Sequence, residues 1–244
     1  MIERLYASDN KNASIKCIYS IITSMKLLLH TCCAPCSVYC IKTLRADNIE
    51  PTLYWYNPNI HPYQEYKARR DCLREYAKLI KVNLLEDDAY GLDEFVCNTY
   101  DKLSTRCQDY CYPKRLRQAF EYAKDNGFDT ITTTLLYSIY QKHDFIKELM
   151  SNLSAEYDID FYYHDFREGW KEGQEEARRI GLYMQKYCGC VFSEEESFLG
   201  REIARKMQKA GISPTNANVR KVIEENKVNN IVIPEQLKSV TFGE

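Results

Sequence analysis

The sequence predicts an α/β fold, with a parallel sheet covered by helices on both faces and a small helical appendage at the C-terminal end. Short apolar segments typical of buried strands alternate with helical segments of about ten residues or more along most of the chain. Past Cys190 this alternation gives way to a highly charged sequence with helical spacing. The expected parts are therefore an N-terminal extension at 1–24, the α/β domain at 25–193 and the appendage at 194–244.

The first strand is expected at Lys26–His30, which contains three leucines, and Pro35 suits the first turn of the helix that follows to about Ala46. The later strands are expected at Thr52–Tyr56, Val82–Leu85, Asp129–Leu135 and Asp160–Tyr163. The later helices are expected at Gln64–Ile80, Gly91–Tyr100, Cys111–Asn126, Gln141–Ser154, Glu172–Ile180, Glu194–Ala210 and Asn216–Lys227. Gly127 and Gly181 are expected to end two of these helices, since glycine accepts the left-handed conformation that terminates a helix.

Three segments of the α/β domain are expected to meet at one edge of the sheet. Ligand sites of parallel sheets lie beyond the carboxyl ends of the strands. Thr31–Cys36 follows the first strand, Asn57–His61 follows the second, and Thr132–Ser138 lies at the end of a later one. We therefore expect the functional site among these segments.

The composition limits the kinds of partner and the compartment. With a net charge of -2 and 28% charged residues, the chain is not a polycation, so any nucleic acid must bind to a local basic patch. No apolar run approaches the ~20 residues that span a bilayer, and the first 24 residues lack the pattern of a secretory signal. We expect a cytoplasmic protein without membrane attachment. There a set of cysteines this large, 11 in all, indicates metal binding or redox chemistry for at least the clustered ones.

Eight of the cysteines form three clusters. The clusters are Cys32, Cys33, Cys36 and Cys40, then Cys107 and Cys111, and finally Cys188 and Cys190. Cys32 and Cys33 precede a helix whose unpaired N–H groups lower thiol pKa and favour thiolate ligands. Cys40 fits a buried helix face better than a metal, and Cys17, Cys72 and Cys97 are interpreted as packing residues. Sulfur ligands suit zinc and iron–sulfur clusters alike, so the spacing leaves both open.

Five motifs carry a resemblance to a known family. In chain order they are LLLHTCCAPCS, YNPNIHPYQEY, RCQDYCYPKRL, FDTITTTLLYS and GLYMQKYCGCVFS. Together they closely resemble the cobalamin-independent epoxyqueuosine reductase family, QueH, over about Met25 to Ser193. The resemblance implies a PP-loop-like fold and the two-electron reduction of the epoxide of epoxyqueuosine to queuosine at the wobble position of tRNA. It also implies a 4Fe–4S cluster and an adjacent mononuclear metal, iron or zinc.

The resemblance assigns the cysteines as follows. Cys32 and Cys33 match the family's paired thiols, and Cys36 matches a metal-capable position. Cys107 and Cys111 match its central pair, although three residues separate them here where the family pattern has two. Cys188 and Cys190 match the terminal CGC and are expected to be ligands or a redox pair.

Epoxide reduction also needs protons and a surface for tRNA. Asp88, His61 and Asp165 are the candidate catalytic residues, with His30 and Tyr137 as further possible proton donors. The basic residues expected to track tRNA phosphates are Lys114, Arg115, Arg117 and Arg167. Tyrosines, of which the chain has 20, offer stacking surfaces for unpaired bases. The sequence identifies no electron donor.

Three other functions compete with this interpretation. A PP-loop-type enzyme that adenylates tRNA needs a glycine-rich phosphate loop after the first strand, where this chain has TCCAPCS. A zinc-stabilised tRNA-binding protein without redox chemistry would explain the cysteines and would be colourless. A thiol oxidoreductase would use Cys33 and Cys36 as a CxxC pair, but this leaves the other clustered cysteines unexplained.

Overall fold

The computed structural model describes residues 25–215, 217–219 and 221–223. By compactness the chain divides into two units, Met1–Gln185 and Lys186–Glu244. The boundary after Ser193 therefore stays a prediction, and the extension at 1–24 lies outside the described residues. No helix among those described is long and apolar enough to cross a membrane.

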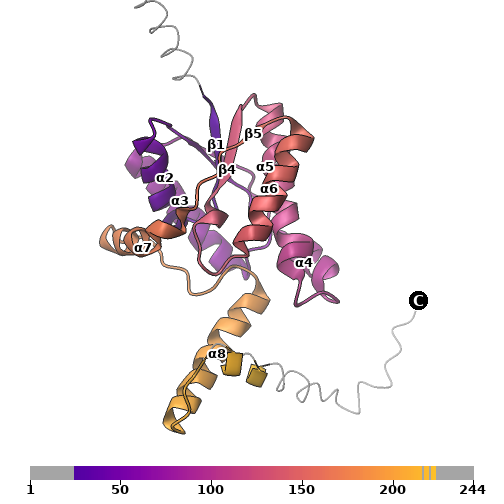
Figure 1. The fold of residues 1–244 in the computed structure, drawn as a ribbon, viewed down its shortest axis with the longest axis vertical. Helices are drawn as coiled ribbons and strands as arrows, with labels where there is room; N and C mark the ends of the chain where they lie inside the picture. Colours follow the sequence, from indigo (N-terminus) through magenta and orange to yellow (C-terminus); the bar gives the residue numbers. More distant parts are fainter. Residues whose placement is uncertain (1–24, 216, 220, 224–244) are drawn as a thin grey trace, which may run out of the picture. The chain divides into compact units, whose positions relative to one another are not determined.

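The first unit is built on a five-stranded parallel sheet in the order β3-β2-β1-β4-β5 (Figure 1). The strands are β1 Leu27–His30, β2 Thr52–Trp55, β3 Leu84–Glu86, β4 Thr130–Thr133 and β5 Asp160–Phe161. In the centre, Leu29 of β1 lies opposite Leu53 on one side and Thr132 on the other. All four residues of β1 are buried, which fits the unbroken apolar run of a strand covered on both faces.

Helices cover both faces of this sheet. The helices of the first unit are α2 Ala34–Ala46, α3 Tyr63–Ile80, α4 Leu92–Thr99, α5 Tyr112–Asp125, α6 His143–Tyr157 and α7 Trp170–Arg179. Figure 1 shows α2, α3 and α7 on one side of the sheet and α5 and α6 on the other. The chain runs outward from β1 to β2 and β3, then returns to β4 and β5 on the other side. The carboxyl ends of β1 and β4 therefore form a topological switch point, the place where such sheets bind ligands.

The predicted fold class is confirmed, and the differences lie at the ends of elements. The strand expected to reach Leu135 ends at Thr133, because the Thr133 hydroxyl accepts a hydrogen bond from the Leu135 N–H at 3.1 Å. This bond starts a short 3₁₀ turn, η2, at Thr134–Leu136. The strand expected to reach Tyr163 ends at Phe161. Two further short turns are the π-helical η1, Cys107–Cys111, and the 3₁₀ turn η3, Phe166–Gly169.

The second unit contains α8, Val191–Lys209. Its predicted start at Glu194 and end at Ala210 differ from these bounds by a few residues, as helix ends commonly do. Of the helix expected at Asn216–Lys227, residues 217–219 and 221–223 are helical, and the remainder lies outside the described residues.

The contact between α2 and α7 depends on a glycine. A Cβ added at Gly173 would lie 2.5 Å from the Tyr137 hydroxyl and 3.1 Å from the Tyr39 Cβ. We expect Gly173→Ala to lower the free energy of unfolding by about 1–3 kcal/mol through overpacking, although alanine favours helix. Urea unfolding followed by circular dichroism measures this change.

Gly200→Ala on α8 is the matched control, because its added Cβ would meet Val219 at an ordinary 3.5 Å. That variant is expected to be as stable as the parent or more so. If Gly173→Ala were at least as stable as the parent, the side chains between α2 and α7 would have to move aside without any loss of stability.

Candidate metal centre

The turn that joins β1 to α2 carries the first cysteines. The Thr31 carbonyl accepts a hydrogen bond from Asn57 Nδ2 at 3.0 Å, and the Cys32 N–H donates to the Thr134 hydroxyl at 3.0 Å. Cys33 is the N-cap of α2, in an extended conformation, and Pro35 fills the first helical turn as the sequence predicts. All three segments expected at this edge of the sheet therefore meet there.

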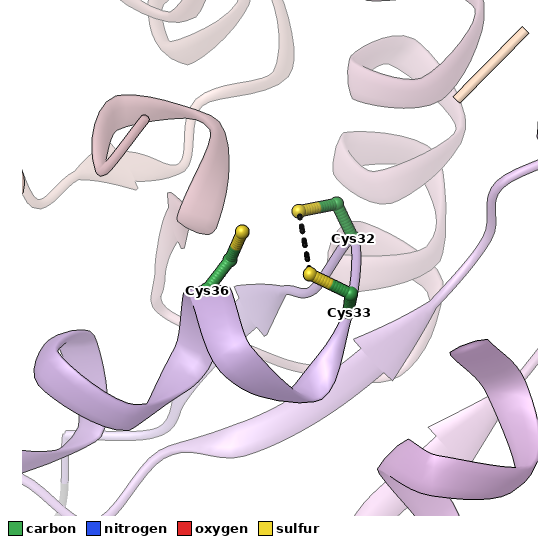
Figure 2. A group of neighbouring side chains, drawn as sticks. All are labelled: Cys32, Cys33 and Cys36. Carbon is green, nitrogen blue, oxygen red and sulfur yellow. Dashed lines mark hydrogen bonds between the residues drawn. The ribbon is translucent and has the colours of Figure 1, made fainter. Parts of the chain in front are cut away.

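Figure 2 shows the side chains of Cys32, Cys33 and Cys36 converging, with Cys36 projecting from the first turn of α2. Their sulfur atoms all lie within 4.8 Å of one another, and the Cys32 and Cys33 sulfurs are 3.8 Å apart. Two thiolates bound at ~2.3 Å to one tetrahedral metal lie about 3.8 Å apart, so this spacing suits a metal. Three protein ligands would also leave a fourth position open.

The surroundings favour thiolate at one of the three cysteines. Hydrogen bonds from the Cys33 and Cys36 thiols and from the Thr134 hydroxyl, together with the positive charge of Arg115, hold the pKa of Cys32 well below its usual range. Burial and the hydrogen bond to Cys32 raise the pKa of Cys33. The hydrogen bonds to Cys32 and Cys33, with burial, raise that of Cys36. All three cysteines can be thiolates together only with a cation among them, and this donor set fits a bound metal.

A buried arginine connects this turn to the second cysteine pair. Arg115 is only 4% exposed; its guanidinium donates to the Asn57 side-chain oxygen at 3.3 Å and to the Cys111 carbonyl at 3.1 Å. Asn57 in turn holds the Thr31 carbonyl. The sequence assigned Arg115 to tRNA phosphates, but its side chain lies inside the fold because these buried oxygens are its partners.

Cys107 and Cys111 lie at the two ends of η1, directly before α5. Cys111 is buried and Cys107 is half-buried against the core. The Tyr112 N–H bonds to the Cys107 carbonyl, five residues back, which defines a π turn. A π turn accommodates one extra residue in a helix. Cys107 and Cys111 therefore lie on nearly the same face of this helical segment, although three residues separate them instead of two. Their sulfurs are outside the group of three described above.

Cys188 and Cys190 belong to the second unit, described here by itself. Cys188 is exposed, whereas Cys190 is buried and is the N-cap of α8. The Ser193 hydroxyl donates to the Cys190 carbonyl at 2.7 Å and accepts from the Gly189 N–H at 3.0 Å, which holds this turn. Their assignment as ligands or a redox pair stays a prediction.

The two candidate catalytic carboxylates are both paired with arginine. Asp88 accepts hydrogen bonds from Arg70 at 2.6 Å and from the Tyr66 hydroxyl at 2.7 Å, and these interactions lower its pKa. Asp165 binds Arg167 at 2.6 Å, which lowers the pKa of its carboxyl to about 2. Both are therefore carboxylates at neutral pH, able to accept a proton but not to donate one.

The candidate histidines are buried. His61 lies with its ring 4.7 Å from that of Phe95 and 5.6 Å from that of Tyr90, and burial lowers its pKa to about 4. His30 contacts the Thr133 hydroxyl at 2.9 Å, and burial with the nearby Arg115 charge lowers its pKa to about 3. Both rings are neutral at physiological pH.

The buried His61 should make stability depend on pH. An unfolded histidine has a pKa of ~6.5, so between about pH 4 and pH 6.5 the unfolded chain binds the extra proton and stability falls as pH falls. His61 alone can change the free energy of unfolding by up to about 1.4 kcal/mol per pH unit in this range. We expect His61→Leu to show a weaker loss than the parent between about pH 7 and pH 5 in urea unfolding. An unchanged slope in His61→Leu would contradict the assignment.

The remaining predicted tRNA contacts are basic side chains that pair with acids. Lys114 binds Glu94 at 2.6 Å, and Arg117 binds Glu156 at 2.8 Å. Both are partly exposed, as is Arg167 beside Asp165. These pairs lie near the surface, where an exposed ion pair contributes little and can be exchanged for a phosphate.

Sequence reasoning missed two polar side chains that touch the sulfurs. Thr134 donates its hydroxyl to the Cys32 sulfur at 3.3 Å, and Gln185 donates its amide to the Cys33 sulfur at 3.1 Å. Both lie within quoted motifs, FDTITTTLLYS and GLYMQKYCGCVFS. Their position in the motifs was the available signal, but their contacts join residues more than 100 positions apart in the chain.

The fold and the cysteine group define a parallel α/β protein with a buried set of thiols, suited to a metal, at the switch point of its sheet. The chain belongs to the family described as epoxyqueuosine reductase QueH, whose model matches residues 27–196. The resemblance drawn from the five motifs is thus confirmed.

Relatives in other organisms carry the same description. The protein of Dehalococcoides mccartyi is 34% identical over 173 residues, which cover 71% of this chain and 94% of the relative. That of Thermotoga maritima is 31% identical over 191 residues, or 74% of this chain and 96% of the relative. One solved structure is described as a predicted subunit of tRNA methyltransferase from Methanocaldococcus jannaschii. Its match covers 77% of this chain and 90% of the solved chain, with a TM-score of 0.43 and 14% sequence identity. So distant a likeness has no bearing on the activity.

Proposed function

We propose that this chain reduces the epoxide of epoxyqueuosine at the wobble position of tRNA to the alkene of queuosine. The reaction consumes two electrons and two protons and releases the epoxide oxygen as water. The observation that supports it is the group of three buried cysteine sulfurs at the switch point, in a chain that belongs to the QueH family. The reaction needs electrons and an electrophile for the oxygen, and sulfur-ligated metals provide both.

We assign the ligands of a 4Fe–4S cluster and an adjacent mononuclear iron or zinc to the clustered cysteines. The proposed ligands are Cys32, Cys33, Cys36, Cys107 and Cys111, with Cys188 and Cys190 as further ligands or a redox pair. When bound, the cluster supplies electrons and the second metal acts as a Lewis acid toward the epoxide oxygen.

The protein's own part is to hold these sulfurs as thiolates away from water. Thr134 donates to the Cys32 sulfur, and the buried charge of Arg115 favours its ionised form. Arg115 also ties Asn57 to the end of η1, so one side chain supports the turn before Cys32 and the segment with Cys107 and Cys111. We therefore propose a supporting role for Arg115 in place of a phosphate contact.

We propose that Asp88, Asp165 and His61 deliver the protons that the reaction consumes. Asp88 and Asp165 are carboxylates beside arginines and must first take up a proton before passing it on. His61 is neutral, so it can relay a proton between its two nitrogens. For tRNA we propose contacts from Lys114, Arg117 and Arg167, and we propose that the protein acts in the cytoplasm.

The deciding experiment is anaerobic purification followed by quantification of iron, acid-labile sulfide and zinc, and then an assay on tRNA that contains epoxyqueuosine. We expect a brown protein with about four sulfides per chain, and conversion to queuosine measured by mass spectrometry of the digested tRNA. A colourless protein with zinc, no sulfide and no conversion would overturn the proposal in favour of a zinc-stabilised tRNA-binding protein.

A further inference from the structure

One uncharged side chain reaches two of the three clustered sulfurs. The Gln185 Nε2 lies 3.1 Å from the Cys33 Sγ and 3.5 Å from the Cys36 Sγ. Both are within the range of N–H···S hydrogen bonds. Gln185 lies in the same compact unit as the two cysteines, although about 150 residues separate it from them in the chain.

The other end of the same amide lacks a comparable contact. Gln185 Oε1 is buried, and no hydrogen-bond donor reaches it among the residues that the structure describes. A buried carbonyl oxygen without a donor is unfavourable, so the two sulfur contacts are the interactions that favour this orientation of the amide. In this orientation N–H groups, not the oxygen, face the sulfurs.

An N–H donor matches a sulfur that accepts. A thiolate, free or bound to a metal, offers lone pairs and no proton, so it accepts such a hydrogen bond more strongly than a thiol sulfur does. Hydrogen bonds to ligating sulfurs withdraw electron density from them and raise the reduction potential of the metal they bind. Because the amide carries no charge, it does this without adding to the net charge of the site.

We propose that Gln185 is a positioning residue that holds Cys33 and Cys36 as metal ligands and raises the reduction potential of the centre they bind. This inference rests on the proposed function to the extent that these sulfurs bind a metal. Gln185 is not itself a ligand. Its two hydrogen bonds set the electron density and direction of the sulfurs.

The test compares three variants of the full chain. Gln185→Met keeps the length of the side chain and removes both N–H groups. Gln185→Glu replaces the donor by a negative acceptor, and it also serves if the methionine variant fails to fold. Gln174→Met is the matched control, because the Gln174 amide faces the Tyr137 hydroxyl at 3.5 Å and no sulfur.

The first readout is the absorbance of metal-free protein reconstituted with Co²⁺ alone, which needs thiolate ligands but no iron–sulfur cluster. We expect the sulfur-to-cobalt charge-transfer band to move to longer wavelength in Gln185→Met and further in Gln185→Glu, and to stay unchanged in Gln174→Met. The second readout is an anaerobic redox titration of the iron-loaded protein. There the equilibrium constant for one-electron reduction should fall about tenfold in Gln185→Met, or about 59 mV.

The outcomes separate this proposal from the proposed function. A Co²⁺ band that shifts as expected in a protein that never reduces epoxyqueuosine would support Gln185 and overturn the reductase. Unchanged bands and potentials in Gln185→Met would overturn the role of Gln185 while leaving the reductase standing. A parent protein without any thiolate band would overturn both.

Discussion

Cys33→Ala is expected to remove most of the bound metal and to abolish turnover. Cys33 is 1% exposed, and its sulfur lies 3.8 Å from that of Cys32 within the group of three. Loss of one of three clustered ligands leaves too few sulfurs to hold a metal against water. We expect metal content and epoxyqueuosine conversion to fall at least tenfold, measured by elemental analysis and by nucleoside mass spectrometry.

The fold should survive this change, because Cys33 caps α2 through its backbone and its side chain makes no capping bond. Circular dichroism checks that point. Cys97→Ala is the matched control, since Cys97 is exposed on α4. Full metal content in Cys33→Ala, or an equal loss in Cys97→Ala, would remove Cys33 from the ligands.

The same experiment on Cys107→Ala tests the second pair. Cys107 is half-buried at the start of the π turn, and only its sulfur is lost in the substitution. We expect lower iron content here as well. Unchanged iron would remove Cys107 from the proposed ligands.

Arg69→Met is expected to destabilise the protein by about 3–5 kcal/mol, because it leaves the buried Glu65 carboxylate without its cation. Arg69 Nε lies 2.7 Å from Glu65 Oε1, and the two side chains are 2% and 9% exposed. The Tyr183 hydroxyl donates to the other Glu65 oxygen at 2.5 Å. The unfolding free energy in urea measures the loss.

Two further variants make this test specific. Arg69→Met combined with Glu65→Gln should recover part of the stability, since no unpaired charge then remains. Lys78→Met on the same helix breaks an exposed pair with Glu75, 73% and 75% exposed, and should cost at most about 1 kcal/mol. Equal losses in Arg69→Met and Lys78→Met would mean that the buried pair contributes no more than a surface pair.

The sequence by itself determined the elements whose signals are local. Three leucines before His30 indicate a strand that is buried on both faces, and Pro35 indicates the start of α2 directly after it. Together these local signals place Cys32, Cys33 and Cys36 in one turn at the carboxyl edge of the sheet. These signals are visible in the sequence because the spacing of apolar residues and the backbone preferences of proline depend only on neighbouring residues.

The charge state of the candidate residues was decided by the tertiary structure. Asp88 and Asp165 are carboxylates because Arg70 and Arg167 lie beside them, and His61 is neutral because aromatic rings enclose it. A pKa depends on burial and on charges a few ångströms away, neither of which follows from sequence position. For the same reason the side chain of Arg115, which looks like a surface charge in the sequence, lies inside against Asn57.

Only the tertiary structure also brought Thr134 and Gln185 to the sulfurs, across 102 and 152 positions of the chain. The sequence supplies the thiols, their order and the edge of the sheet at which they gather. The fold supplies the hydrogen bonds and buried charges around them, because such contacts form only when separate strands and helices close on one another.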